Sequence, residues 1–394
     1  MECSAIREAL ERGEFEFHYQ PKVEFLTGTV SGAEALIRWR RADGEVVSAS
    51  RFIPEAQSCG LVPLLTERMF PRLMEDQQRL RAAGVNPHIA LNISADDLDA
   101  PHLLHLIRDA IGQHHLDSTE LELEITEGAA VSDNQASRRT LTGLVAAGIS
   151  LSMDDYGTGF SSLETLDRLP FSAIKLDQRF VFRMLRSPKT TALIKTSVAA
   201  ANMLGIKMVV EGIETEQAYR ALARLGCSDG QGYWISPALP LDDYLALLAS
   251  GRRWPCSALG PLRLAALTHQ WHYTLLLDQL AAALHPDPAT DPLSALAHVH
   301  EEGEQCALGR WYVGPGLALA GDPDYDALDA PHREMHDLCG VLLSDVQGGF
   351  GPAQLAPVLT RLGESALQVA AHLERLERRL MLEELTALHG GEPR

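Results

Sequence analysis

The sequence has few basic residues for its size. Its 394 residues include 34 Lys and Arg against 53 Asp and Glu, which gives a formal net charge of −19. A protein that binds polymeric DNA or RNA, or an anionic membrane, needs clusters of positive charge. We therefore expect neither a nucleic-acid polymer nor a membrane as a partner. A small phosphate substrate is compatible with this charge, because bound divalent cations would reverse the field of an acidic cleft.

Long apolar runs and closely spaced cysteines are missing as well. No apolar run approaches the ~20 residues that a membrane-spanning helix needs. No basic segment precedes an apolar one at the N-terminus in the manner of a signal peptide. The six cysteines are scattered without C-x-x-C spacing. We therefore expect reduced thiols and a cytoplasmic protein.

Composition and chain breaks divide the sequence into two domains. With 46% hydrophobic residues the chain is expected to fold, and it is longer than one hydrophobic core usually supports. Gly and Pro interrupt the pattern at 251–256 (GRRWPC), where strand-like runs end. We predict a first domain over 1–252, a linker over 253–261 and a second domain over 262–394.

The first domain alternates short β-branched or apolar runs with stretches of helical period. Such repeated βα units predict an α/β fold of the TIM type, a (β/α)8 barrel. The first two runs are separated only by LTG at 26–28, which is too short for a parallel crossover, so we predict a modified barrel with an antiparallel first strand. The predicted strands are 15–25, 29–39, 88–93, 121–125, 149–154, 173–176, 207–210 and 231–235. The predicted outer helices are 97–113, 132–147, 187–204 and 214–225.

The second domain lacks strand-like runs. Its apolar residues recur at helical spacing over 262–284, 293–308, 328–345 and 353–388. A Pro- and Asp-rich insertion at 285–292 and a predicted loop around 309–324 separate some of these segments. The pattern predicts an all-α four-helix bundle.

Polar side chains gather where the predicted barrel strands end. In a barrel, the C-terminal ends of the strands form the rim on which active sites are built. A single acidic residue in such a place is usually a helix cap, but capping does not account for a whole set on one rim. The set is Asn92, Glu124, Asp154, Asp155, Lys175, Asp177, Glu211 and Gln231.

Oxygen donors near this rim would repel one another without cations between them. Oxygen ligation without histidine favours Mg²⁺ or Mn²⁺ over zinc. The neighbours Asp154 and Asp155 could let one carboxylate bridge two ions ~3.5–4 Å apart, as two-metal phosphate hydrolysis requires. The donors are Glu34, Asn92, Glu124, Asp154, Asp155 and Glu211.

Successive motifs of the first domain resemble those of EAL-domain cyclic di-GMP phosphodiesterases. They occur in order over about the first 250 residues. The motifs are YQPK (19–22), EALIRW (34–39), NIS (92–94), EITE (124–127), DDYGTG (154–159), IKLD (174–177), EGIET (211–215) and QGY (231–233).

The resemblance implies that the domain hydrolyses cyclic di-GMP to linear pGpG by a two-metal mechanism. Lys175 would orient the attacking water or stabilise the developing charge, and Gln231 would help to place the nucleophile or substrate. Glu211 is also considered a general base in this family. The implied ligands of the first metal are Glu34, Asn92, Glu124 and Asp154, and those of the second are Asp154, Asp155 and Glu211. The implied substrate contacts are Gln20, Leu36, Arg38 and Asp177.

In the same family, the loop at 155–162 couples the metal site to a dimer interface, so a homodimer is expected. Glu127 would anchor this loop, and Glu214 is a second coupling residue. All implied ligands are present, which favours an enzyme over the main alternative, a catalytically inactive cyclic di-GMP receptor. A glycoside hydrolase on a similar barrel is a more distant alternative that offers no role for Lys175.

The second domain carries a pair of histidines that could chelate one ion. His332 and His336 are i and i+4 on a predicted helix and so share one face. Upstream lie Cys306 and His269, which would complete a tetrahedral Cys-His₃ zinc site inside a helical bundle. His272 could replace His269, because it lies about one turn further along the same predicted helix.

This order of a histidine, C-x-L-G-x-W and H-x-x-x-H resembles the chemoreceptor zinc-binding (CZB) domain over about residues 262–388. The resemblance implies one Zn²⁺ bound by His269, Cys306, His332 and His336. Such a site would depend on pH and on oxidation of Cys306, as suits a sensor. A permanent structural zinc with no signalling role is the alternative. We therefore predict a phosphodiesterase regulated by zinc or thiol redox chemistry, in which zinc rigidifies the bundle and acts on the 155–162 loop through the dimer.

Overall fold

The computed structural model describes residues 2–100, 102–113, 115–130, 134–157, 163–284 and 306–389. The chain folds into two compact units. The first unit contains residues 1–196, 204–222 and 227–256, and the second contains 197–203, 223–226 and 257–394. The long continuous part of the second unit therefore starts at Ser257, and its first helix begins inside the predicted linker, at Leu259.

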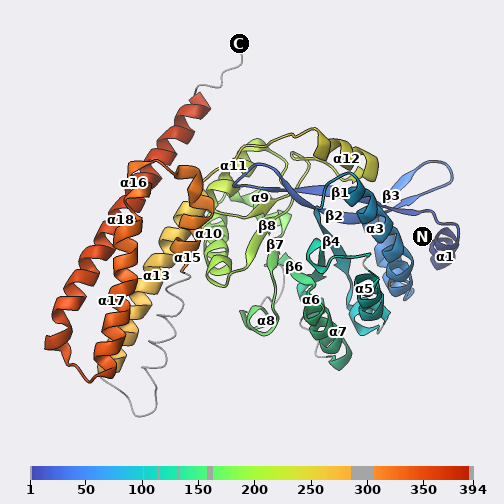
Figure 1. The fold of residues 1–394 in the computed structure, drawn as a ribbon. Coiled ribbons are helices and arrows are strands. Elements are labelled where there is room, and N and C mark those ends of the chain that lie inside the picture. Colours follow the sequence, from blue (N-terminus) through green and yellow to red (C-terminus); the bar gives the residue numbers. More distant parts are fainter. Residues whose placement is uncertain are drawn as a thin grey trace. The chain divides into compact units, whose positions relative to one another are not determined.

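The first unit is a closed eight-stranded barrel with helices outside it (Figure 1). Strand β1 pairs with both β2 and β9, which closes the ring. β1 runs antiparallel to both neighbours, whereas the other pairs around the ring are parallel. This confirms the predicted modified TIM barrel. The ring strands are β1 (Phe15–Glu24), β2 (Val30–Arg40), β4 (His88–Ile93), β5 (Leu121–Thr126), β6 (Ser150–Tyr156), β7 (Ala173–Leu176), β8 (Lys207–Val210) and β9 (Asp229–Gly230).

The antiparallel start of the barrel follows from the short connection between β1 and β2. Gly28 takes a positive φ of 67°, a conformation that glycine adopts without a steric penalty. The chain can therefore reverse within a few residues and pair β2 directly with β1. Two short strands, β3 (Val46–Ser48) and β10 (Leu239–Pro240), add to β2 and β1 beside the ring.

Helices surround the barrel, as the apolar periodicity between strands indicates. They are α1 (Cys3–Glu11), α2 (Ala49–Ser58), α3 (Val62–Ala82), α4 (Ala95–Asp99), α5 (His102–Gly112), η1 (Ser118–Glu120), α6 (Glu127–Ala130), α7 (Gln135–Ala146), α8 (Leu163–Arg168), α9 (Gln178–Met184), α10 (Pro188–Met203), α11 (Glu216–Leu225) and α12 (Leu241–Ala249).

The predicted eighth strand at 231–235 is wrong. The ring strand is Asp229–Gly230, and the residues after it form a turn. The turn begins at the motif glycine: Gly232 has φ +155°, and a Cβ there would collide with the backbone of Ile213. The QGY motif therefore lies just after the strand and places Gln231 at the rim of the barrel.

The second unit is all-α within its described residues. Its elements are α13 (Leu259–Leu284), α15 (Ala307–Val313), η2 (Pro315–Leu319), α16 (Pro323–Asp326), α17 (Asp329–Gln347) and α18 (Pro352–His389). Helix α18 packs against α17 and α13, and α15 packs against α13, as the neighbouring ribbons in Figure 1 show. Leu308, Leu328, Leu342, Leu355 and Leu362 are among the residues of their shared apolar core.

The predicted loop around 309–324 is wrong, because most of these residues form the short helical segments α15, η2 and α16. Helix α16 has a clear start, since Asp322 accepts hydrogen bonds from the amides of Asp324 and Tyr325. Most of the predicted helix 293–308 and all of the insertion 285–292 lie outside the described residues.

A disulfide bond joins Cys3 in α1 to Cys59 at the C-terminal end of α2. The expectation that all six cysteines are free thiols is therefore wrong. The two residues are separated by 56 positions, and nothing in their local spacing indicates that they pair. Within the described part of the chain, the remaining cysteines are free. No helix among the described residues has the length and apolar character needed to cross a membrane.

Candidate functional site

The polar side chains predicted at the barrel rim come from successive strands or from the residues that follow them. Parallel strands bring their C-terminal ends to one mouth of the barrel, and the register places Asn92 directly opposite Glu124. Glu34 lies in the middle of β2 rather than at its end. The positions are Glu34 on β2, Asn92 on β4, Glu124 on β5, Asp154 and Asp155 on β6, Lys175 on β7, Glu211 after β8 and Gln231 after β9.

Lys175 is the centre of this cluster. Its side chain is 1% exposed, and its Nζ lies 2.6 Å from a carboxylate oxygen of Glu211, 3.3 Å from one of Glu34 and 3.4 Å from one of Asp154. Its Nζ also donates a hydrogen bond to Oε2 of Glu124. One ammonium group therefore contacts four carboxylates that come from four different strands or strand ends.

Amide side chains complete the surroundings of Glu34. Asn92 Nδ2 donates to Glu34 Oε1 at 2.6 Å, and Gln231 Nε2 donates to Glu34 Oε2 at 2.6 Å. Gln231 also approaches Glu211 Oε1 at 3.2 Å. Both oxygens of Glu34 are thus held in place, so this buried carboxylate presents a fixed orientation to the centre of the cluster.

Burial and charge act against each other on the pKa values here. Burial acts to raise the pKa of Glu34, but the charges of Lys175 and Lys22 outweigh it and the pKa is lowered. Burial acts to lower the pKa of Lys175, but the surrounding carboxylates hold it well above its usual value. For Glu124, burial and the neighbouring charge of Glu34 raise the pKa to about 8, although both lysines oppose the rise.

Glu211 has the environment of a proton acceptor near neutrality. Burial raises its pKa to about 7, and the charges of Asp154 and Glu34 add to the rise against the opposing charge of Lys175. A general base works best when its pKa lies near the working pH. Glu211 can therefore accept or release a proton near neutral pH, where Glu34 stays ionised.

The donor set fits divalent cations that prefer oxygen. Carboxylates outnumber the ammonium groups in this buried cluster, and charges that are not matched in a protein interior are costly. The available ligand atoms are carboxylate and amide oxygens, which suit Mg²⁺ or Mn²⁺. The residues present therefore fit the predicted kind of metal. In the structure, the ammonium group of Lys175 supplies part of the positive charge that these carboxylates need.

Asp155 stands apart from the carboxylates around Lys175. It has a positive φ of 58°, the only such value at a non-glycine position within the described residues. Burial and the charges of Asp154 and Asp177 raise its pKa. A non-glycine residue in this region of φ is uncommon and is often found at functional sites. The left-handed backbone directs the Asp155 side chain to Asp177, whereas its neighbour Asp154 faces Lys175.

The predicted substrate residues occupy different places around the mouth. Gln20 on β1 pairs in register with Glu34 and hydrogen bonds to the backbone oxygen of Ser236 at 3.4 Å. Leu36 and Arg38 follow on β2 and are half-buried. Among the described residues, the guanidinium of Arg38 donates only to the neighbouring backbone oxygen of Ile37, at 3.0 Å. This leaves most of its donors for a ligand.

Asp177 has a structural role in addition to any contact with substrate. It is the N-cap of α9 and accepts hydrogen bonds from the amide and Nε of Arg179, at 2.8 and 2.7 Å. Of the two predicted coupling residues, Glu127 is buried at the start of α6 and Glu214 is exposed after β8. Most of the predicted coupling loop, residues 158–162, lies outside the described residues.

Lys22 and Glu122 are two further buried charged residues, which the pattern of polar strand ends does not predict. Lys22 Nζ lies 2.8 Å from Glu124 Oε1 and 3.0 Å from Glu122 Oε1. The signal for both is the two-residue period of a strand. Lys22 is two positions from Gln20, and Glu122 is two positions from Glu124, so each pair points to the same side of its strand.

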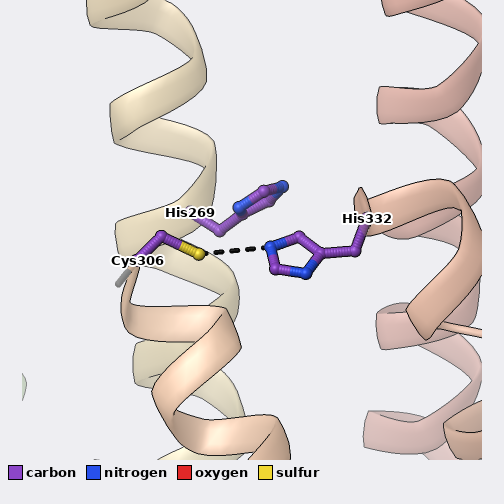
Figure 2. A group of neighbouring side chains, drawn as sticks. All are labelled: His269, Cys306 and His332. Carbon is purple, nitrogen blue, oxygen red and sulfur yellow. Dashed lines mark hydrogen bonds between the residues drawn. The ribbon is translucent and has the colours of Figure 1, made fainter. Parts of the chain in front are cut away.

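A second group of polar side chains lies inside the helical unit. Figure 2 shows His269 from α13, Cys306 at the start of α15 and His332 from α17 directed toward a common point. Cys306 Sγ is 3.1 Å from His332 Nε2, and His336 Nε2 is 3.1 Å from the same nitrogen. One ligand atom each from His269, Cys306 and His332 lie within 4.8 Å of one another. The four predicted ligands are therefore neighbours in space.

The local sequence explains this convergence. His332 and His336 are one turn apart on α17 and share a face. Cys306 is the N-cap of α15, where its Sγ accepts a hydrogen bond from the amide of Gly309 at 3.3 Å. His269 is buried, and its Nε2 has no hydrogen-bond partner among the described residues. A buried nitrogen in this state is costly unless it has a ligand.

The donor chemistry fits a tetrahedral zinc ion. Burial lowers the pKa of His269 to about 3 and that of His332 to about 4, so both imidazoles are neutral ligands at pH 7. Burial raises the pKa of the Cys306 thiol, although hydrogen bonds from backbone amides oppose this. A bound zinc ion would reverse that rise, because zinc binds the thiolate. His272 acts on His269 through its charge but is not part of the close group of ligand atoms.

Two family models match parts of this chain. The model of the EAL domain matches residues 4–238. The chain belongs to the EAL domain family. The model of the chemoreceptor zinc-binding domain matches residues 275–342. This second range contains Cys306, His332 and His336 but begins after His269.

Named relatives resemble the EAL part. The bifunctional diguanylate cyclase/cyclic di-GMP phosphodiesterase MucR of Pseudomonas aeruginosa is 37% identical over 246 residues, which are 62% of this chain and 36% of MucR. The cyclic di-GMP phosphodiesterase RocR of the same organism is 36% identical over 236 residues, 60% of each chain. The chain thus spans between about a third and three fifths of the length of these relatives.

Solved structures resemble the EAL barrel as well. A phosphodiesterase structure of PaMucR in complex with c-di-GMP superposes with a TM-score of 0.57 at 36% identity, covering 61% of this chain and 98% of that one. The EAL enzyme Bd1971, in a form bound to cAMP and cyclic di-GMP, gives a TM-score of 0.58 at 30% identity, covering 62% of this chain and 67% of that one.

Proposed function

We propose that this EAL protein hydrolyses cyclic di-GMP to linear pGpG with the help of two divalent cations, Mg²⁺ or Mn²⁺. The observation that carries the proposal is the cluster of buried carboxylates around Lys175 at the barrel mouth. The activities named for MucR and RocR support the choice of substrate. A cytoplasmic location stays a prediction.

The metal ligands in this proposal are those of the motifs. The ions, when bound, would supply the charge that makes a water nucleophilic and neutralises the phosphate oxygens. The first ion would be held by Glu34, Asn92, Glu124 and Asp154, and the second by Asp154, Asp155 and Glu211. Asp155, now beside Asp177, would turn toward the cluster as ligand.

The other steps of the hydrolysis are assigned to side chains of the site. The water oxygen forms a bond to phosphorus, the bond from phosphorus to the ribose 3′ oxygen breaks, and this oxygen takes a proton from solvent and leaves as a hydroxyl group. Glu211, with its pKa raised to about 7, accepts the proton of the water. Lys175 stabilises the charge that develops on the phosphate, and Gln231 orients the nucleophile. Arg38, whose guanidinium suits phosphate oxygens, and Gln20 bind the dinucleotide while Leu36 lines the pocket of a guanine base.

A turnover experiment tests the enzyme. The purified chain with Mg²⁺ or Mn²⁺ is incubated with cyclic di-GMP, and the linear product is measured by liquid chromatography and mass spectrometry. We expect pGpG from the wild type and from Glu75→Gln, an exposed position on α3, and none from Glu34→Ala. Tight binding of cyclic di-GMP without product in the presence of metal would instead identify the inactive receptor.

The helical unit binds one zinc ion through His269, Cys306, His332 and His336 in this proposal. The grouped ligand atoms and the orphan nitrogen of His269 support the site. Zinc or the redox state of Cys306 then regulates the hydrolysis, with a homodimer as the active form. Metal analysis of the wild type should give one zinc per chain, and Cys306→Ser should lose it.

Regulation requires its own measurement. Turnover with Mg²⁺ and the mass of the assembly in solution are compared before and after removal of zinc with a selective chelator. Cys306→Ser without chelator serves as a second zinc-free sample. If zinc removal changes neither turnover nor assembly, zinc is a structural part of the bundle and the regulatory role is abandoned.

A further inference from the structure

A second buried lysine lies beneath the carboxylate cluster. The side chain of Lys22 on β1 is 6% exposed, and its Nζ contacts Glu122 Oε1 at 3.0 Å and Glu124 Oε1 at 2.8 Å. In the β1–β2 register Lys22 faces Gly32, whereas Gln20 faces Glu34. Lys22 is therefore one layer deeper in the barrel than the carboxylates that surround Lys175.

Lys22 and Lys175 each hold one oxygen of the Glu124 carboxylate. Its Oε1 accepts a hydrogen bond from Lys22, and its Oε2 accepts one from Lys175. Glu124 is 1% exposed, so water does not compete for either oxygen. The two lysines approach from different strands, β1 and β7, and together they fix the rotation of the carboxylate plane.

We propose that Lys22, itself held by Glu122, is a positioning residue that fixes the carboxylate of Glu124 so that only Oε2 faces the metal site. This inference rests on the proposed two-metal function. Groups that hydrogen bond to a ligating carboxylate orient it, and their removal usually costs about 10- to 100-fold in metal affinity or activity. Lys22 thus acts on the metal through Glu124 and touches neither metal nor substrate.

The substitution Lys22→Met distinguishes an effect of the lysine charge from the positioning of Glu124, because the two predict opposite changes in the binding of a cation. Lys22→Met keeps an unbranched apolar stem but removes a positive charge near the site. If Lys22 acted only through its charge, its removal would tighten the binding of a cation. If it positions Glu124, the freed carboxylate turns away or pairs differently, and the binding of Mn²⁺ weakens by about 10-fold or more.

A double substitution separates these effects further. Lys22→Met with Glu122→Gln removes one positive and one negative charge and leaves the net charge of the layer unchanged. The double variant also avoids leaving Glu122 as a buried charge without its partner, which protects the fold. Positioning predicts weak Mn²⁺ binding in both variants, whereas a pure charge effect predicts binding close to wild type in the double variant.

The experiment measures Mn²⁺ binding to the full chain by calorimetry, with zinc already bound in the helical unit, and unfolding by urea in parallel. Lys207→Met is the matched control, because Lys207 is an exposed lysine at the start of β8. Weaker binding in the single and double variants with a normal control supports the proposal. Wild-type or tighter binding in either variant overturns it, even if stability falls. A wild type that binds no Mn²⁺ contradicts the proposed function instead.

Discussion

The buried histidines make the zinc-free helical unit sensitive to acid. His269 and His332 have pKa values of about 3 and about 4 in the folded chain, whereas an unfolded histidine titrates near about 6.5. Below that pH the unfolded chain therefore binds more protons than the folded chain. Stability from these groups is complete above about pH 6.5 and falls as the pH drops toward the folded values.

The size of the loss follows from the same values. At pH 5 each of the two imidazoles would be charged in the unfolded chain and still neutral in the folded chain. One pKa unit corresponds to about 1.4 kcal/mol, so each group destabilises the fold by about 2 kcal/mol at pH 5. Together they remove up to about 4 kcal/mol, which is a large part of the stability of an ordinary domain.

Hydrogen exchange on the full chain measures this loss where it occurs. After removal of zinc, amide protection in peptides of α17 is compared at pH 8 and pH 5, with correction for the intrinsic exchange rates. Peptides from β5 in the barrel provide an internal reference. We expect α17 to lose up to about 4 kcal/mol relative to this reference, and His269→Leu to lose about half as much. Equal protection of α17 at both pH values would refute the reasoning, because it would mean that the imidazoles are not held neutral.

Three further predictions concern the barrel. Lys175→Met should destabilise the metal-free protein by about 3–5 kcal/mol, since it removes an ammonium group that contacts four carboxylates. Mn²⁺ should restore much of this loss in urea unfolding. Reduction of the Cys3–Cys59 bond should lower the stability of the barrel by up to about 4 kcal/mol, as the 56-residue separation implies, and Cys59→Ser should have the same effect. An unchanged urea midpoint with and without reductant would contradict this. Gly212→Ala should reduce both stability and turnover, because Gly212 has φ +68° and an added Cβ would collide with Gln178. A variant with wild-type turnover and stability would show that the turn after β8 can shift without cost.

Much of the barrel was predictable because its strands are continuous apolar or β-branched runs. The runs ending near Ile93, Ile125 and Leu176 appear as strands with nearly the expected bounds. The predicted eighth strand begins too late in the chain, because the actual strand is only two residues long and the motif after it, with the apolar Ile235, resembles a strand in sequence. Helices α2 and α3 were not predicted, and each contains an internal proline, which weakens a helical pattern.

The candidate sites were also only partly predictable from local sequence patterns. Most of the proposed metal ligands could be chosen from strand ends and from the spacing of His332 and His336, since both are local patterns. The position of Lys175 among its carboxylates, and of Lys22 beneath Glu124, depends on strand register around a closed ring. A single sequence contains no local signal for those distances, just as it contains none for the Cys3–Cys59 pair.

The ammonium of Lys175 gives the barrel an internal counter-ion that is part of the chain itself. Its charge offsets part of the mutual repulsion among the acidic groups at the mouth of the folded barrel. We therefore expect the barrel to fold without divalent ions, unlike a small zinc finger. In the proposed mechanism, the folded protein would bind its ions afterwards, and the fraction competent for hydrolysis would follow the concentration of free Mg²⁺ or Mn²⁺ around it.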